Sequence, residues 1–238
     1  MKKIKLIIVT ISICVLFSSQ IVSAGTLEEN PILKNYREYA EESPSETFID
    51  FYSTFYQNKE QFEIYDTDGN NITNSFYNDT YHFYEKADYM GLKSYILNND
   101  IAGGKQRIQE VQETLPETRS FKTGSVSERY FYNVYEHPAA GELEYYIKGS
   151  YSWNLTTGKI ASQSVASIDI TRCEFGLAWS HATDHMTADS WISNDGYTAY
   201  FSGSFHLEVT LGFDIAGFPV GWTVDCGTYS GTASGTGH

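Results

Sequence analysis

The sequence predicts an α+β protein, in which an N-terminal helical and hairpin region precedes an antiparallel β-sandwich with one disulfide. Three observations predict this class. Residues 44–58 carry apolar side chains at helical spacing. From residue 119 onward, apolar and polar side chains alternate over long stretches. Two cysteines, Cys173 and Cys226, remain once the first 24 residues are excluded.

Residues 1–24 have the three parts of a secretory signal peptide. Three lysines lie within the first five residues, an apolar run covers 6–17, and Val22 and Ala24 are the small residues of a cleavage site before Gly25. The apolar run is shorter than the roughly 20 residues that a membrane-spanning helix needs. We therefore expect cleavage between Ala24 and Gly25 and secretion of the mature chain. Because no later segment is long and apolar enough to span a bilayer, we expect no transmembrane segment.

The chain is acidic and rich in tyrosine. Its formal net charge is −14, and removing a signal with three lysines and no acid gives −17. Such a chain is repelled by phosphates, so we expect no nucleic-acid partner. Its 19 tyrosines exceed what a core needs, because each buried hydroxyl requires a partner. One interpretation is that exposed tyrosines contact an extracellular protein or a glycan. The alternative, which two-layer α+β packing favours, is that a second sheet and the N-terminal helices cover both faces of the tyrosine-rich strand at 129–136.

Residues 25–118 form the predicted α+β region. Ser43, Pro44 and Glu46 have the spacing of a capping box, which predicts a helix over 44–58. A weaker helix is expected over 31–41.

The rest of this region is predicted to hold a hairpin and two helices. In the segment 62–79 the period changes to two, and an Asp-Gly pair at 68–69 predicts a β-hairpin. A short helix is expected after Asp88, which would be its N-cap. A second, solvated helix is expected over 104–116, ended by Pro116.

Residues 119–238 form the predicted β-sandwich domain. Apolar and polar residues alternate over long stretches at 142–155, 197–211 and 218–226, which are joined by turn residues. This pattern favours antiparallel sheets that have one face in the core and one face exposed to solvent. Tyr146 and Tyr200 fall on the outward faces of their strands and are the candidate binding residues.

Cys173 and Cys226 are predicted to form a disulfide. A secreted chain meets an oxidising environment, in which an even pair of cysteines most simply forms one bridge. It would close a loop of about fifty residues and stabilise the fold by roughly 3–4 kcal/mol.

The segment SHATDHMTAD (180–189) holds the candidate metal ligands His181, Asp184 and His185. Two histidines four residues apart share one metal ion only on a helix, because on a strand they lie about 13 Å apart. The pattern H-x-x-D-H resembles the H-x-x-E-H motif of inverted zinc proteases, with Asp in place of Glu. The segment lies between predicted strands, and the alternative is a polar connecting loop.

The function that these features favour is a non-enzymatic extracellular binding protein without a cofactor. One alternative is a metal-dependent hydrolase that uses the HATDH segment. Another is a pore-forming β-protein, because the Ser/Thr-rich amphipathic hairpin at 150–169 is long enough to cross a membrane as strands.

Overall fold

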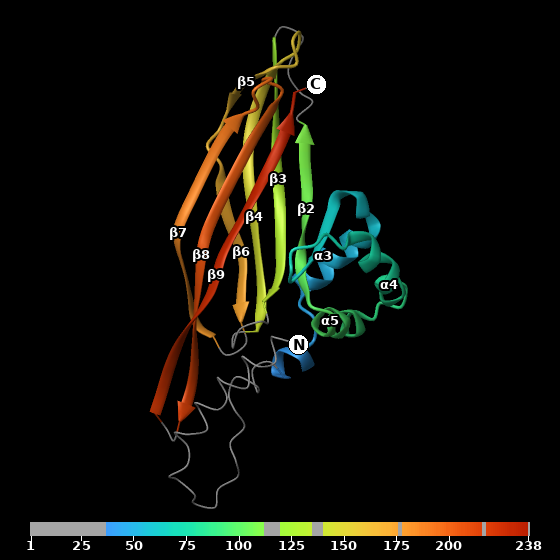
Figure 1. Cartoon of the computed structure of the whole chain (residues 1–238), viewed down its shortest axis with the longest axis vertical. Helices are drawn as coiled ribbons and strands as arrows, with labels where there is room; N and C mark the ends of the chain where they lie inside the picture. The colour runs from blue at the N-terminus through green and yellow to red at the C-terminus, as the bar shows by residue number, and fades with distance from the viewer. Residues whose placement is uncertain (1–36, 112–119, 135–139, 176–177, 216–217, 238) are drawn as a thin grey trace, which may run out of the picture. The chain divides into compact units, whose positions relative to one another are not determined.

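The computed structural model describes residues 37–111, 120–134, 140–175, 178–215 and 218–237 (Figure 1). The elements in chain order are α3 (Glu46–Gln57), the 3₁₀ helix η1 (Lys59–Gln61), β1 (Phe62–Asp66), α4 (Thr73–Glu85), α5 (Tyr89–Asn98), β2 (Ile101–Val111), β3 (Phe121–Val134), β4 (Gly141–Asn154), β5 (Ile160–Gln163), β6 (Ser167–Phe175), β7 (Ala178–Ile192), β8 (Thr198–Ile215) and β9 (Phe218–Thr236). The predicted signal peptide lies outside the described residues.

The strands form two antiparallel sheets. Sheet A contains β1, β2, β3 and β4 in that order, and both β5 and β6 pair with β4. Sheet B contains β7, β8 and β9. Because β1 and β2 come from the predicted region 25–118, strands from both predicted regions share sheet A. The β character predicted from residue 119 onward is confirmed.

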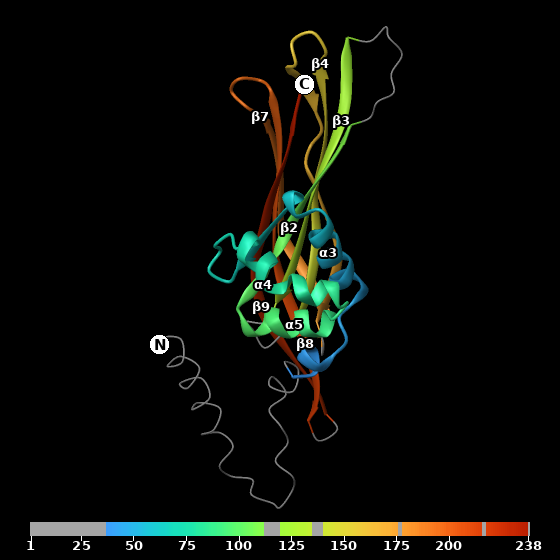
Figure 2. The same ribbon diagram turned by 90° about the vertical axis from the view of Figure 1, so that its right-hand side faces the viewer.

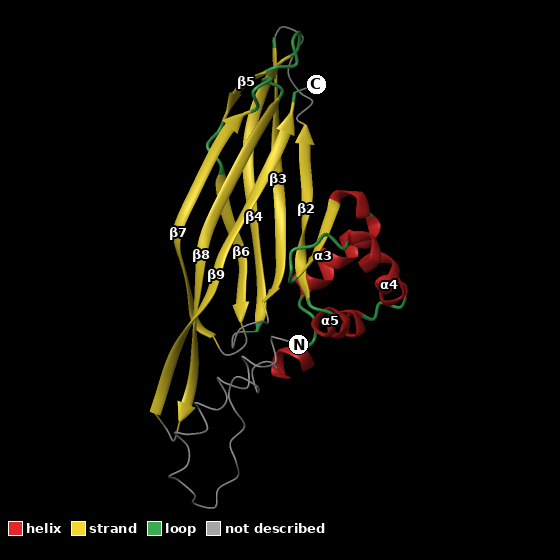
Figure 3. Cartoon of the chain, in the orientation of Figure 1, coloured by secondary structure: helices red, strands yellow, loops and turns green. Residues whose placement is uncertain are grey.

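The helices lie on one side of sheet A (Figure 3). In α3, the aromatic residues at helical spacing point inward and pack against Phe131 of β3, whose ring stacks on Phe51 at 5.1 Å. The predicted helix over 44–58 is confirmed, but its N-cap is Ser45, which accepts a hydrogen bond from the Phe48 backbone N–H. The predicted cap at Ser43 is therefore two residues early.

The hairpin predicted over 62–79 is wrong in its second half. Phe62–Asp66 is a strand, and the Asp66 carboxylate accepts bonds from the backbone N–H groups of Asp68 and Asn70 in the expected turn. The chain then continues as helix α4 instead of a returning strand. Phe76 and Thr80, four residues apart, form the buried face of that helix. This helical spacing was overlooked because the residues just before it alternate as in a strand.

The solvated helix predicted over 104–116 is also wrong, because Ile101–Val111 is strand β2 between β1 and β3. Pairing on both sides supplies backbone hydrogen bonds that outweigh the helical preference of its Gln, Arg and Lys residues. The neighbouring prediction at Asp88 is confirmed: its carboxylate accepts a bond from the Gly91 N–H and caps α5. The weaker predicted helix is present at 37–41 within the described residues.

The other side of sheet A faces sheet B, and the side chains between them form one hydrophobic cluster. Tyr145 of β4 meets Phe205 of β8 edge-on at 5.0 Å. Leu143, Tyr145, Ile147, Tyr151 and Trp153 are all buried here, which confirms the inward face predicted for this strand.

Tyrosine hydroxyls from sheet A bond the outer edge of β9. Tyr145 donates to the Ser230 carbonyl at 2.9 Å, and the Tyr130 hydroxyl accepts from the Thr232 N–H at 2.8 Å. Small residues make room for these rings, since a Cβ at Gly231 would lie 2.5 Å from the Tyr130 ring. An edge strand normally leaves such backbone groups unpaired. Many of the tyrosines therefore have a structural role inside the protein.

Within the described ranges, no helix is long and apolar enough to cross a membrane.

Candidate functional site

The helix-facing side of sheet A carries a layer of buried charges under α3. Arg129 of β3 donates to Glu144 of β4 at 2.6 Å and to Asp50 of α3 at 2.8 Å. Ser45 donates to Glu142 at 2.6 Å, and burial raises the pKa of that carboxyl group. Each buried charge here has a partner, as a buried charge requires. This layer fixes α3 to the sheet.

The helices leave the far part of this face uncovered, where β3 and β4 continue beyond them (Figure 2). A groove of about 500 Å³ lies there. Its lining residues are Ile108, Ser125, Val126, Ser127, Tyr146, Lys148, Gly149, Ser150, Ser164 and Ser167. Five of the ten are serines, so the groove offers a dense set of hydroxyl groups. We call it the serine groove.

Tyr146 lies where the charged layer meets the serine groove. It pairs with Arg129 on one side and with Asp169 of β6 on the other. The Lys148 Nζ lies 4.9 Å from the centre of the Tyr146 ring and 2.6 Å from the Asp169 carboxylate. Partial burial raises the pKa of the Tyr146 hydroxyl. At neutral pH this site therefore presents a neutral phenol beside a lysine whose charge is balanced by Asp169.

The serine hydroxyls of the groove differ in how they are bonded. Ser164 accepts from the Ser150 N–H at 3.0 Å and donates to the Val165 carbonyl. The buried Ser127 hydroxyl has no hydrogen-bond partner among the described residues. A buried polar group without a partner lowers the stability of the fold.

Tyr200, the second predicted binding residue, lies on sheet B, whereas Tyr146 lies on sheet A. The two residues therefore do not form one site. Its ring stacks on Trp191 of β7 at 5.2 Å, with 12° between the planes. Trp191 is 41% exposed. A smaller groove of about 290 Å³, lined partly by Asp189 and Ser202, lies on the same sheet. The molecule therefore presents two separate aromatic surfaces.

The HATDH segment is neither a helix nor a loop, because it lies inside strand β7. His181 pairs with the buried Val209, whereas Asp184 pairs with His206, so the two fall on opposite faces of the sheet. A bulge follows Asp184, and His185 adopts a positive φ of 49° within it. The helical geometry that a shared metal ion needs is absent from this described strand.

His185 instead faces His206 of the neighbouring strand. The two rings lie 6.5 Å apart, the His185 Nδ1 is 3.0 Å from Asp184, and the His206 Nε2 is 3.3 Å from Asp225. The contacts of His206 with His185 and Asp225 join different strands, which spacing along the chain does not reveal. Among the described residues, no group of three or more His, Cys, Asp or Glu side chains is arranged to hold a metal ion.

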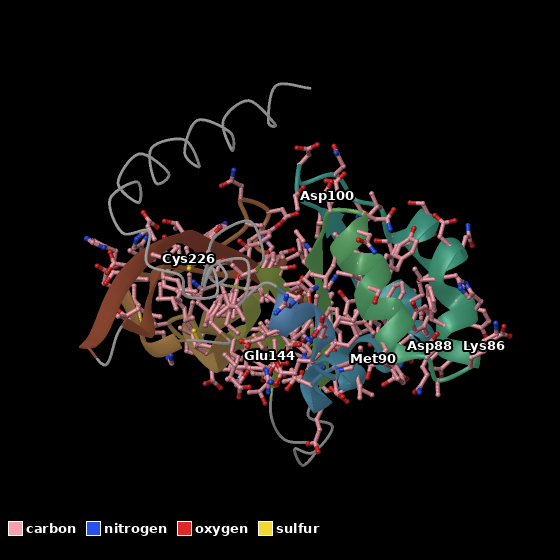
Figure 4. All side chains as sticks on the ribbon, turned by 90° about the horizontal axis from the view of Figure 1, so that it is seen from below. Lys86, Asp88, Met90, Asp100, Glu144 and Cys226 are labelled. Atoms are coloured by element: carbon pink, nitrogen blue, oxygen red, sulfur yellow. The ribbon has the colours of Figure 1, made fainter. Side chains whose placement is uncertain are left out.

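The predicted disulfide is not formed in the structure, where Cys173 and Cys226 are free thiols. Cys226 of β9 belongs to the hydrophobic cluster between the sheets (Figure 4). Cys173 of β6 packs against the same cluster. Burial raises the pKa of Cys173 to about 12 and that of Cys226 to about 11. Disulfide formation proceeds through a thiolate, so this setting opposes oxidation of the folded chain.

Glu128 is a buried carboxyl group that the sequence analysis missed. It lies on the side of sheet A opposite the charged layer, with its Oε1 3.9 Å from the Lys105 Nζ and its Oε2 without a hydrogen-bond partner among the described residues. Burial raises its pKa to about 7, although Lys105 and Arg107 oppose that shift. The sequence did hold a sign of this burial, because Glu128 lies two residues before the inward Tyr130 on the same face of β3.

Comparisons of the chain with protein-family models, with curated proteins and with solved structures found no significant match.

Proposed function

We propose that the protein is a secreted, non-enzymatic binding protein that holds a neutral polyhydroxylated ligand, such as a glycan chain, in the serine groove. The observation that carries this proposal is the groove itself. It combines an aromatic ring at Tyr146 with five serine hydroxyls, one of which has no hydrogen-bond partner among the described residues. Sugar rings offer apolar faces for aromatic packing and hydroxyls for hydrogen bonding, so this combination suits them.

The charge of the groove favours a neutral ligand. Among its described lining residues the one ionic side chain is Lys148, which is balanced by Asp169 at 2.6 Å. The chain as a whole carries a net charge of −14. An anionic polymer would meet repulsion with only one compensated lysine to offset it.

The lining of the groove favours binding over catalysis. Among the lining residues that the structure describes, there is no carboxylate, imidazole or thiol. Hydrolysis of a glycosidic bond ordinarily needs two carboxyl groups, as general acid and as base or nucleophile. The hydrolase alternative rests on the HATDH segment, whose two histidines differ from the required helical arrangement.

The pore-forming alternative meets a different difficulty. The apolar residues Tyr151 and Trp153 of its proposed membrane hairpin are each 3% exposed and belong to the cluster between the sheets. A membrane hairpin at 150–169 would require the two sheets to separate.

We also propose that the two sheets form a β-sandwich and that the mature chain begins at Gly25. The shared cluster of Tyr145, Phe201 and Phe205 supports the first part. N-terminal sequencing of the protein recovered from the culture medium tests the second, and a chain that still begins with Met1 would contradict it.

Retention on immobilised neutral polysaccharides tests the ligand class. We expect the wild-type protein to be retained on at least one of dextran, mannan, xylan and chitin. Tyr146→Ala should lower the affinity about tenfold or more, because it removes the aromatic contact. Tyr200→Ala, which removes the corresponding aromatic residue of sheet B, is the matched control and should leave retention unchanged.

Equal loss in both variants would place the ligand elsewhere, and loss of retention in Tyr200→Ala alone would assign it to sheet B. Failure of the wild-type protein to bind any of the four polysaccharides would contradict the proposed ligand class. Thermal melts of both variants establish that the fold is kept.

A further inference from the structure

Four large apolar side chains are exposed at the end of the molecule where the β4–β5 and β7–β8 turns lie. Their exposed fractions are 47% for Phe121, 52% for Leu155, 39% for Ile192 and 42% for Tyr197. They come from the start of β3, the β4–β5 turn, the end of β7 and the β7–β8 turn. Figures 1 and 2 both show these parts of the chain at the same end, together with the C-terminus. We call these four residues the end patch.

Backbone hydrogen bonds hold the turns of the end patch together. The Leu155 N–H donates to the Ser120 carbonyl at 2.9 Å, which joins the β4–β5 turn to the start of β3. The Ile160 N–H donates to the Gly196 carbonyl at 2.8 Å, which joins the same turn to the β7–β8 turn. The backbone segments that carry the apolar side chains are therefore connected to one another by hydrogen bonds.

Two lysines accompany the end patch. Lys159 lies with its Nζ 5.8 Å from the centre of the Tyr197 ring, and the Lys122 Nζ lies 6.0 Å from the centre of the Trp153 ring. One described acid is close, Asp195, whose carboxylate accepts bonds from Ser193 and from the Tyr197 N–H. After Arg172 the sequence contains no lysine or arginine. Among the described residues, two lysines and one acid therefore lie near the end patch, on a chain that is acidic as a whole.

We propose that the end patch is a membrane-docking surface that inserts its apolar side chains at the interface of a bilayer containing anionic lipid. Aromatic and aliphatic side chains flanked by lysines are the usual composition of interfacial anchors, because the lysine heads stay among the lipid headgroups. Charges beyond a Debye length of about 8 Å are largely screened at physiological salt. The acidic remainder of the chain therefore repels the membrane only weakly while this end is in contact.

The size of the end patch argues for lipid and against a second copy of the chain. Four side chains that are about half exposed offer on the order of 300 Å², given the 150–250 Å² that a fully buried aromatic residue contributes. A stable protein interface buries about 800 Å² on each partner. A bilayer needs no complementary partner surface, so a small apolar tip is sufficient for reversible docking.

Co-sedimentation with vesicles tests this proposal on the full mature chain. We expect the wild-type protein to bind vesicles of phosphatidylcholine with 30% phosphatidylserine, and to bind pure phosphatidylcholine more weakly. The triple variant Phe121→Ser, Leu155→Ser, Tyr197→Ser should lose binding to both. The pair Lys122→Ser, Lys159→Ser should weaken binding to the anionic vesicles roughly 25-fold, because each lysine near such a surface contributes about a factor of five.

Met90 provides the matched control. It is 39% exposed and lies on α5, in the helical layer away from both sheets (Figure 4). Met90→Ser should bind vesicles as the wild-type protein does. Leu155→Ser alone should give an intermediate loss, which keeps the test valid if the triple variant is poorly folded.

Three results would overturn the proposal. They are a wild-type protein that binds neither vesicle, serine variants that bind as well as the wild-type protein, and a dimer in solution that these variants abolish. The serine groove plays no part in this test, so Tyr146→Ala should bind vesicles normally. Failure of the proposed glycan binding would leave the vesicle result unchanged.

Discussion

At the scale of the residue, Glu128 and Arg129 are neighbours in the chain but lie in different chemical surroundings. Arg129 faces the helices and is paired with Glu144 and Asp50. Glu128 faces the other side of sheet A and has one carboxylate oxygen without a partner among the described residues. Because successive strand residues point to opposite sides, one position along the chain separates a paired charge from a carboxyl group with raised pKa.

Glu128→Gln should stabilise the protein at alkaline pH but not at acidic pH. The folded protein keeps the proton on Glu128 up to a pKa of about 7, whereas the unfolded chain releases it near 4.5. The folded state therefore binds more protons between these pH values, and wild-type stability falls as pH rises through this window. Above pH 7 the variant should be more stable by on the order of 2 kcal/mol. Urea unfolding of both proteins at pH 4.5 and pH 8 measures this difference, and an equal difference at the two pH values would refute it.

Ser127→Ala separates the cost of an unpartnered hydroxyl from its proposed use. Without ligand, the variant should be more stable by about 1 kcal/mol, because the buried hydroxyl has no partner in the described part of the chain. Its affinity for the polysaccharide that retains the wild-type protein should nevertheless fall. Melting curves and retention measurements on the same preparation test both parts, and a variant with reduced stability and unchanged affinity would contradict both.

At the scale of the element, the strands with clear alternation were predictable and the elements defined by distant partners were not. The inward face of β4 follows from its sequence, because Leu143, Tyr145 and Ile147 alternate with polar residues. Strand β2 lacks that pattern and is a strand because β1 and β3 pair with it. The inward tyrosines were also unpredictable, since their partners are backbone groups of β9, about 85 to 100 residues away.

Tyr130→Phe should remove one hydrogen bond to the outer edge of β9, at Thr232. The variant removes the acceptor of the Thr232 N–H, so that amide should exchange with solvent faster. The amide of Ala233, which pairs with Phe201 in the ladder, is the internal control and should keep its protection. We expect a loss of about 1–2 kcal/mol in stability. Unchanged exchange at Thr232 in a hydrogen-exchange experiment would show that the hydroxyl does not protect this edge.

At the scale of the whole molecule, the interior between the sheets determines the state of the cysteines. Cys173 and Cys226 reach the same hydrophobic cluster from different sheets, as the predicted disulfide requires, but their burial as free thiols was not predicted. The candidate site is likewise assembled from residues that are distant in the sequence. Tyr146 was identifiable as an outward residue, but its serine neighbours come from β3, β4 and the β5–β6 segment, so only strand register brings them together.

Thiol titration of the mature chain tests the free-thiol state. In the folded protein, neither cysteine should react appreciably with a thiol reagent at pH 8, because burial raises the pKa of both thiols well above that value. In denaturant without reductant, two thiols per chain should react. A titration of zero under those conditions would mean that Cys173 and Cys226 had formed a disulfide.

The most direct test of the central claim is amide chemical-shift mapping of the isotope-labelled protein, titrated with oligosaccharides cut from the polysaccharide that retains it. We predict shifts that concentrate at the serine groove, at Ser125, Ser127, Tyr146 and Ser150, while the amides of Trp191 and Tyr200 on sheet B stay in place. Shifts centred on Trp191 and Tyr200, or none at saturating oligosaccharide, would contradict the assignment of the serine groove as the binding site.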